Sequence, residues 1–228
     1  MIKGIAIGIV LSFAPAAFAE TYIVPDGDCG AVTLNATRGG DFPNLGETIG
    51  ADRVAGAYVV LPKQKVAVKP AAGPRSLVFN ANVSGDGVVM AAVDFTPVVS
   101  GDETRTEHAK AFIRCGAIAR GDDWQRSTGL GVEIYPQWNG RMPLKPGESM
   151  RFIAVDKATN KLIRNVPMEL YRAGAGLVAG GTPDQNGGMN FPYSEPGRYM
   201  VTTTYRRPDP QQPQHWLVDT STLTFEIK

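Results

Sequence analysis

Short runs of β-forming residues recur along almost the whole chain, and this pattern constrains its fold more than any other feature. "SLVFNANV", "SMRFIAVD" and "RYMVTTTYRR" are examples, and each lies between residues that favour turns. The 26 Gly and 17 Pro supply many such breaks, more than a helical protein usually contains. Regular strand spacing of this kind is typical of immunoglobulin-like or transthyretin-like sandwiches. The sequence therefore predicts an all-β protein.

The first nineteen residues have the pattern of a secretory signal peptide. Lys3 provides a positive start, "IAIGIVLSF" is an apolar run too short to span a bilayer, and "AFA" is a small-residue cleavage motif. We therefore expect the mature chain to begin at Glu20. No later run of apolar residues is long enough for a transmembrane helix, so we expect a periplasmic or secreted protein without a membrane span after cleavage.

The strand pattern divides the rest of the chain into three parts. Residues 20–101 are predicted to form a first β-sandwich, and residues 129–228 a C-terminal immunoglobulin-like sandwich. In the C-terminal part the connections are short, which favours antiparallel hairpins over βαβ units. Residues 102–128 between them are predicted to be a short helical connector.

The helical prediction rests on the stretch that begins at Thr104. Glu107 follows three residues later, as in a capping box, and Ala109, Phe112 and Ile113 continue at helical spacing. The later half, "AFIRCG", is equally consistent with a strand, because the period of a short apolar run cannot distinguish the two.

The chain has two cysteines, Cys29 and Cys115. An exported chain with an even number of cysteines normally oxidises them, so we predict a disulfide between the two. Two free thiols remain the alternative, and the separation of the two Cα atoms decides between them.

Two histidines are the candidate metal ligands. His108 follows Glu107, and His215 lies near Asp219, so each pairs an imidazole with a carboxylate. Each also has a simpler interpretation: His108 as a packed or capping side chain, and His215 as an exposed loop residue before the last strand. A shared site would require the two imidazoles to converge in space.

Charge and missing motifs exclude several functions. The chain has 23 Lys+Arg and 22 Asp+Glu, and loss of Lys3 with the signal peptide leaves 22 − 22 = 0, which argues against a nucleic-acid partner. There is no nucleophile elbow, no H-E-x-x-H, no C-x-x-C and no P-loop. The glycine-rich "GAGLVAGG" lacks a βαβ context and is interpreted as a hairpin loop. The chain is therefore predicted not to be an enzyme.

The order of several short motifs resembles the NikM-like periplasmic family. They are a central R-x-E-x-A-K-A segment, a G-x-x-E-I-x-P strand, an L-x-P-G turn, P-G-R-Y, and a final W-x5-T-L-T-F-E strand. Here they occupy residues 105–111, 131–136, 144–147, 196–199 and 216–226. In many relatives the mature chain begins with histidine, whereas this chain has Glu20 there.

The resemblance implies an exported accessory protein that binds or delivers a divalent metal of the nickel or cobalt type for uptake. A metal-uptake transporter or another envelope protein would be its partner. The candidate ligands are His215 and His108 with Glu107 or Asp219, since neutral imidazole suits nickel, cobalt, zinc and copper. The alternative is a metal-free β-sandwich interaction module that contacts an envelope protein or transporter through loops or an edge strand.

Overall fold

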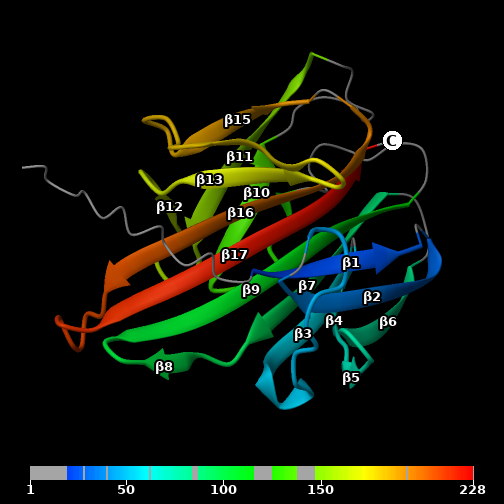
Figure 1. The fold of residues 1–228 in the computed structure, drawn as a ribbon, viewed down its shortest axis with the longest axis horizontal. Coiled ribbons are helices and arrows are strands. Elements are labelled where there is room, and N and C mark those ends of the chain that lie inside the picture. The colour runs from blue at the N-terminus through cyan, green and yellow to red at the C-terminus, as the bar shows by residue number, and fades with distance from the viewer. Residues whose placement is uncertain are drawn as a thin grey trace, which may run out of the picture.

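The computed structural model describes residues 20–27, 29–39, 41–61, 63–83, 87–115, 125–137, 147–193 and 195–227. Within these ranges the chain is all-β, as predicted, and its strands form three sheets (Figure 1). Apart from a 3-10 assignment at Gln125, helical structure in this part of the chain is limited to one 3-10 turn, Ala51–Arg53. No helix in this part of the chain is long and apolar enough to cross a membrane.

The first sheet contains four antiparallel strands from the N-terminal part of the chain. Their order is β1 (Thr21–Asp26), β2 (Gly30–Arg38), β6 (Leu77–Val83) and β5 (Ala71–Ala72). Every second residue of β6 is buried, beginning with Leu77, because alternate side chains of a strand point to opposite faces.

The largest sheet has nine strands and crosses the whole molecule (Figure 1). Its order is β14 (Gly176–Gly181), β13 (Met168–Arg172), β16 (Gly197–Pro208), β17 (Trp216–Ile227), β9 (Glu103–Cys115), β7 (Gly87–Phe95), β3 (Val54–Leu61) and β4 (Gln64–Ala67), with β8 (Val98–Ser100) beside β9. The strand β14 corrects the interpretation of "GAGLVAGG" as a loop.

The third sheet is small and lies near the C-terminal half of the large one. The strand β11 (Ser149–Asp156) pairs with β10 (Val132–Gln137) on one side. On its other side it pairs with β12 (Lys161–Ile163) and β15 (Gly188–Pro192). Burial alternates strictly along β11, so one face of this sheet is directed into a core.

The predicted helix at Thr104 is wrong: residues Glu103–Cys115 form the long strand β9. This strand is enclosed by β7 on one side and runs parallel to β17 on the other. Tertiary pairing on both edges thus overrides the local helical spacing. The rest of the predicted connector, residues 116–124, lies outside the described residues.

The strand β9 also changes the predicted organisation into two separate antiparallel sandwiches. It joins β7 from the first predicted unit to β17 from the second, so both units share one sheet. Ala111 belongs to the core under the first sheet, whereas its neighbour Phe112 belongs to the core under the small sheet. The centre of the large sheet is therefore buried on both faces.

The predicted disulfide between Cys29 and Cys115 is confirmed. The two Cα atoms lie 5.3 Å apart, a separation that a disulfide spans. Cys29 immediately precedes β2 of the first sheet, and Cys115 ends β9 of the large sheet. The bond thus ties the two layers of the N-terminal core together.

Candidate functional site

A buried group of charged side chains surrounds His108 on β9. The residue is only 2% exposed. Its Nδ1 lies 2.5 Å from a carboxylate oxygen of Asp94, and its Nε2 lies 2.9 Å from a carboxylate oxygen of Asp219. The guanidinium of Arg207 donates to the other oxygen of Asp219. Four charged side chains from β7, β9, β16 and β17 therefore form one chain of contacts.

Local packing fixes this arrangement. In the strand register, Asp94 of β7 pairs directly with His108. On β17, Asp219 lies two residues from the residue that pairs with His108. Gly131 covers the ring: a Cβ at this position would lie 2.9 Å from the imidazole Cε1, so a larger residue would collide with it. The imidazole is thus held on all sides.

The electrostatics keep His108 charged. Burial alone would lower its pKa, but the hydrogen bonds and charges of Asp219 and Asp94 outweigh burial and raise the pKa to about 9. Burial alone would raise the pKa of Asp219, yet His108 and Arg207 lower it. At neutral pH the site therefore contains an imidazolium between two carboxylates.

This geometry does not fit a metal ligand. A charged imidazole donates from both ring nitrogens and has no free lone pair for a metal ion. His108 uses both nitrogens on carboxylates, so it acts as a structural cation. It equally lacks a nitrogen with which to accept a proton from a substrate.

The structure separates the other predicted ligands from His108. Glu107 points to the opposite face of β9, where it accepts hydrogen bonds from Thr21 and, at 2.6 Å, from Arg38. His215 instead lies 2.8 Å from the hydroxyl of Thr104.

Thr104 and His108 are four positions apart on β9, which corresponds to roughly 13 Å along a strand. Of the four predicted ligands, only His108 and Asp219 come together. Among the described residues no group of three His, Cys, Asp or Glu could hold a metal ion.

Two members of the charged group were missed by the sequence analysis. Asp94 and Arg207 carry no motif, and they reach His108 and Asp219 only through strand pairing. The alternating polar residues in β-type runs were the only available signal, and that signal does not identify partners.

A second buried group surrounds Lys110, on the same face of β9. The residue is 1% exposed, and its ammonium has no hydrogen-bond partner among the described residues. It lies 4.3 Å from the centre of the Tyr135 ring, a cation–π contact. Burial lowers its pKa to about 8, although the nearby Glu133 opposes this effect.

Glu133 is fully buried and its carboxylate is enclosed by donors. One oxygen accepts the backbone N–H groups of Thr128 and Gly129, each at 2.6 Å, and that of Leu130 at 3.1 Å. The other oxygen accepts the hydroxyl groups of Ser127 and Tyr135. The carboxylate thus anchors the loop before β10, a structural task that leaves no acceptor free for chemistry.

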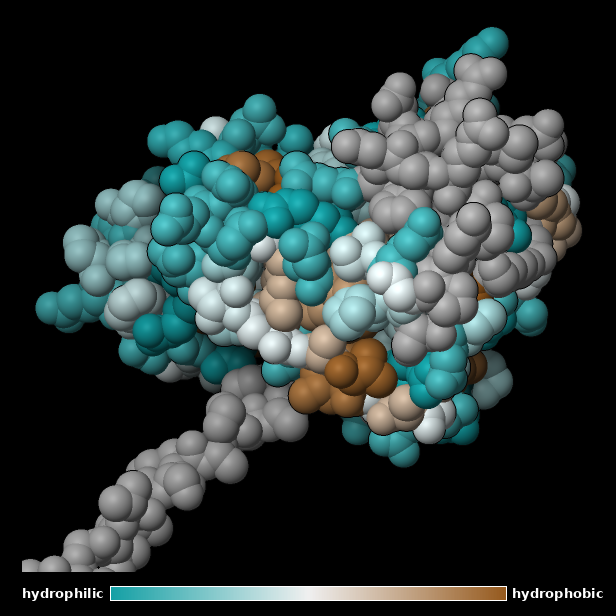
Figure 2. Space-filling view, turned by 90° about the horizontal axis from the view of Figure 1, so that it is seen from above, coloured by the Kyte–Doolittle hydropathy of each residue, from teal (hydrophilic) through white to brown (hydrophobic). Residues whose placement is uncertain are grey.

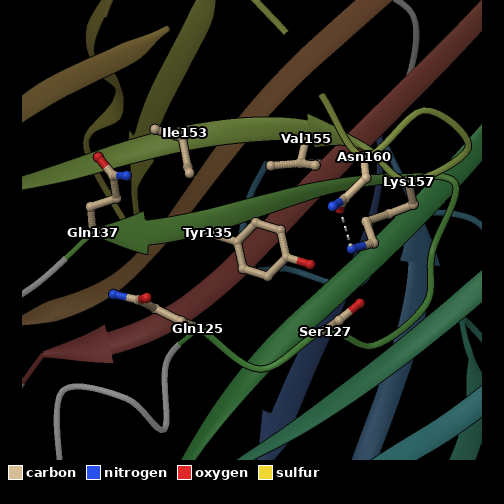
Figure 3. A pocket seen from close by; sticks show the side chains of 8 residues that line it. All are labelled: Gln125, Ser127, Tyr135, Gln137, Ile153, Val155, Lys157 and Asn160. Carbon is tan, nitrogen blue, oxygen red and sulfur yellow. Dashed lines mark hydrogen bonds between the residues drawn. The ribbon is translucent and has the colours of Figure 1, made fainter. Parts of the chain in front are cut away.

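A shallow hollow of about 270 Å³ lies beside Tyr135 on the outer face of β10 and β11 (Figure 3). Its lining residues are Gln125, Ser127, Tyr135, Gln137, Ile153, Val155, Lys157 and Asn160. Lys157 donates to Asn160 at 3.2 Å, and the hydroxyl of Tyr135 is bound to Glu133. The hollow contains no pair of free titratable groups, so it does not present the parts of an acid–base site.

The remaining candidate is a surface, the edge strand β14. Its outer side has no strand neighbour among the described residues, since the large sheet ends there. Leu177 and Val178 on this strand are 55% and 43% exposed. Figure 2 shows that the molecule carries a compact apolar patch on a face that is otherwise largely hydrophilic.

Comparisons with known proteins add little to this geometry. No protein-family model matches the chain, and no curated protein matches it. Among solved structures, a tetra-tandem repeat in the extending region of a large adhesion protein is similar at 9% identity and a TM-score of 0.28. The match covers 92% of this chain and 49% of the adhesion-protein chain, so this chain spans about half the length of that one. The resemblance to the NikM-like family stays a prediction.

Proposed function

We propose that the protein is an exported, metal-free interaction module that binds an extended segment of another envelope protein along β14. The exposed edge of the large sheet carries this proposal. A free edge presents unpaired N–H and C=O groups, which an incoming strand can satisfy by adding to the sheet. The disulfide between Cys29 and Cys115 supports an exported location.

The edge β14 differs from the other sheet edges because it has neither the charge and proline nor the short length that protect them. Its six residues, Gly-Leu-Val-Ala-Gly-Gly, include no charge and no proline. By contrast, β4 carries a lysine, β15 ends in a proline, β5 has two residues and β12 has three. Lysine, proline and short length are three of the features that normally prevent edge-to-edge pairing.

The irregular pairing of β14 suggests how a partner would be recognised. The register with β13 shifts between Ala179 and Leu177, which makes Val178 an extra residue in a bulge. A bulge re-aims side chains and shortens the stretch that can pair. A partner would therefore add a short strand and place apolar side chains against Leu177 and Val178.

Delivery of a transition metal stays a prediction, and the geometry favours it less. His108 is held by two carboxylates, and His215 is bonded to Thr104 about four strand positions away. Two ligands of one ion must both come within about 2 Å of it, which this separation prevents without rearrangement.

Lysine substitutions on the edge test the proposal. A chain with Leu177→Lys and Val178→Lys should keep its fold, because both side chains are exposed, and it should lose its partner, because charge on an edge opposes strand addition. We expect a photoreactive phenylalanine at position 178 to form a discrete adduct in cells that export the chain. The partner protein identified from this adduct, once purified, should bind the lysine variant at least about tenfold more weakly than it binds the unmodified chain. That is a loss of ~1.4 kcal/mol.

A matched control carries Val66→Lys and Leu162→Lys, at two other apolar positions that are 38% and 40% exposed. This control should bind like the unmodified chain. Equal binding by both variants would contradict the proposal. Concentration-dependent dimerisation that only the β14 lysines abolish would assign the edge to a second copy of this chain and would also overturn it.

A further inference from the structure

The start of β1 places carboxylates over the large sheet without an accompanying cation. Thr222 donates to the backbone carbonyl of Thr21 at 2.7 Å, which fixes the strand above β16 and β17. In the sheet below, Thr202 pairs with both Thr222 and Glu169. Glu20, the residue before β1, is thereby held next to Thr202 and close enough to Glu169 for their charges to repel.

The negative charge here is not balanced within the described residues. Glu169 accepts a hydrogen bond from the hydroxyl of Tyr171 at 2.7 Å, but neither it nor Glu20 forms an ion pair. Arg38, which pairs with Thr21 in the strand register, is engaged by Glu107 at 2.6 Å. Glu20 and Glu169 are both partly buried and their charges repel, an arrangement that calls for a positive group.

The hydroxyl of Thr202 also indicates that the site lacks a component. Its hydroxyl is buried, in a residue only 3% exposed, and it makes no hydrogen bond of good geometry. It lies close enough to Glu20 to lower that carboxyl's pKa, yet it makes no other contact that would satisfy it among the described residues. Buried polar atoms are rarely left in this state, so a further polar group is expected there.

We propose that cleavage of the signal peptide after Ala19 completes this site by creating the α-ammonium of Glu20, which pairs with Glu169 and with the Glu20 carboxylate. Hydrolysis of the Ala19–Glu20 peptide bond by water leaves a carboxylate on Ala19 and a free amine on Glu20. This amine carries a proton at neutral pH. Export would therefore be coupled to stability, because only the processed chain contains the cation that the two carboxylates require.

The Glu20 carboxyl reports whether the ammonium is present. With its amine in a peptide bond, burial raises the pKa of Glu20 to about 7, Thr202 opposes this rise, and the charge of Glu169 adds to it. The groups that face it are Glu169 and Tyr171 from β13, Thr202 from β16 and Tyr22 from its own strand. A new ammonium would act against the repulsion between the carboxylates.

The experiment compares the mature chain starting at Glu20 with the same chain acetylated at its α-amine, a change that removes only the charge. The Glu20 carboxyl carbon is followed by NMR from pH 3 to pH 9. We expect it to titrate at least about one unit lower with the free amine, since an opposite charge nearby lowers a carboxyl pKa by about 1 to 3 units. Acetylation should also lower the thermal midpoint, and it should have no such effect in a Glu169→Gln variant.

A third chain that retains Ala19 before Glu20 moves the amine by one residue and should behave like the acetylated chain. Identical Glu20 titrations in the free and acetylated chains would overturn the proposal. So would an acetylation effect on the midpoint that persists unchanged in Glu169→Gln, because the partner would then be another group.

Discussion

Replacing His108 with glutamine is expected to lower the free energy of unfolding by about 3 to 5 kcal/mol near pH 6, which is the usual effect of removing one partner from a buried ion pair. Glutamine is neutral and similar in length, so Asp94 and Asp219 lose the cation between them. Urea unfolding of the two chains measures the difference. The matched control is His215→Gln, which removes only a contact to Thr104 and should change stability by about 1 kcal/mol or less.

The effect of His108 should depend on pH in a defined direction. Its pKa is raised from 6.5 in the unfolded chain to about 9 in the folded one. The stabilisation is therefore fully present below pH 6.5 and is lost as pH rises to about 9, a total of about 3 kcal/mol from the 1.36 kcal/mol per unit relation. Lys110 has a lowered pKa, so its contribution to stability rises with pH, opposite to that of His108. The Lys110 contribution is the same in both chains and cancels in their difference. If the difference in unfolding free energy between the unmodified and His108→Gln chains stayed constant from pH 6 to pH 10, His108 would not be a buried cation.

Removing the disulfide is the second change with a large expected effect. Cys29 and Cys115 are 86 residues apart, and the chain-entropy model assigns about 4 to 5 kcal/mol to a loop of that length. Alanine at both positions is the suitable replacement, because Cys115 is 1% exposed and a serine hydroxyl there would be buried without a partner. We expect a large fall in the urea midpoint relative to the oxidised chain.

Thiol titration provides the check on that result. Denatured, unreduced mature protein should contain no free thiol, and reduction should release two. Two free thiols before reduction, or a double-alanine chain as stable as the oxidised one, would contradict the structural role of this bond.

The all-β class and the disulfide could be predicted because both depend on local or compositional signals. Strand runs such as that of β11 alternate in sequence as they do in burial, and the cysteine count needs no geometry. The strand β9 could not be predicted in the same way. Its helical spacing of Ala109, Phe112 and Ile113 is overridden by neighbours on β7 and β17, and β17 lies more than one hundred residues away in the sequence.

The candidate site was only partly predictable for the same reason. His108 and Asp219 were singled out, but they were assigned to a metal because the second carboxylate, Asp94, had no recognisable motif. The neighbouring Glu107 was grouped with His108 on a helix, whereas adjacent residues of a strand face opposite sides. The exposed edge of β14 was interpreted as a loop, since six small and aliphatic residues carry little strand signal.

Calorimetric titration of nickel, cobalt, zinc and copper into the tag-free mature chain at pH 7 tests most directly whether the histidines hold structural charges or a metal ion. We expect no saturable binding that depends on a histidine: the imidazole of His108 is charged and occupied at this pH, and His215 is alone beside Thr104. The His215→Ala chain should therefore behave like the unmodified one. Saturable binding of any of the four metals that His215→Ala abolishes, and that weakens as pH falls below about 6.5, would contradict the metal-free module and favour metal delivery.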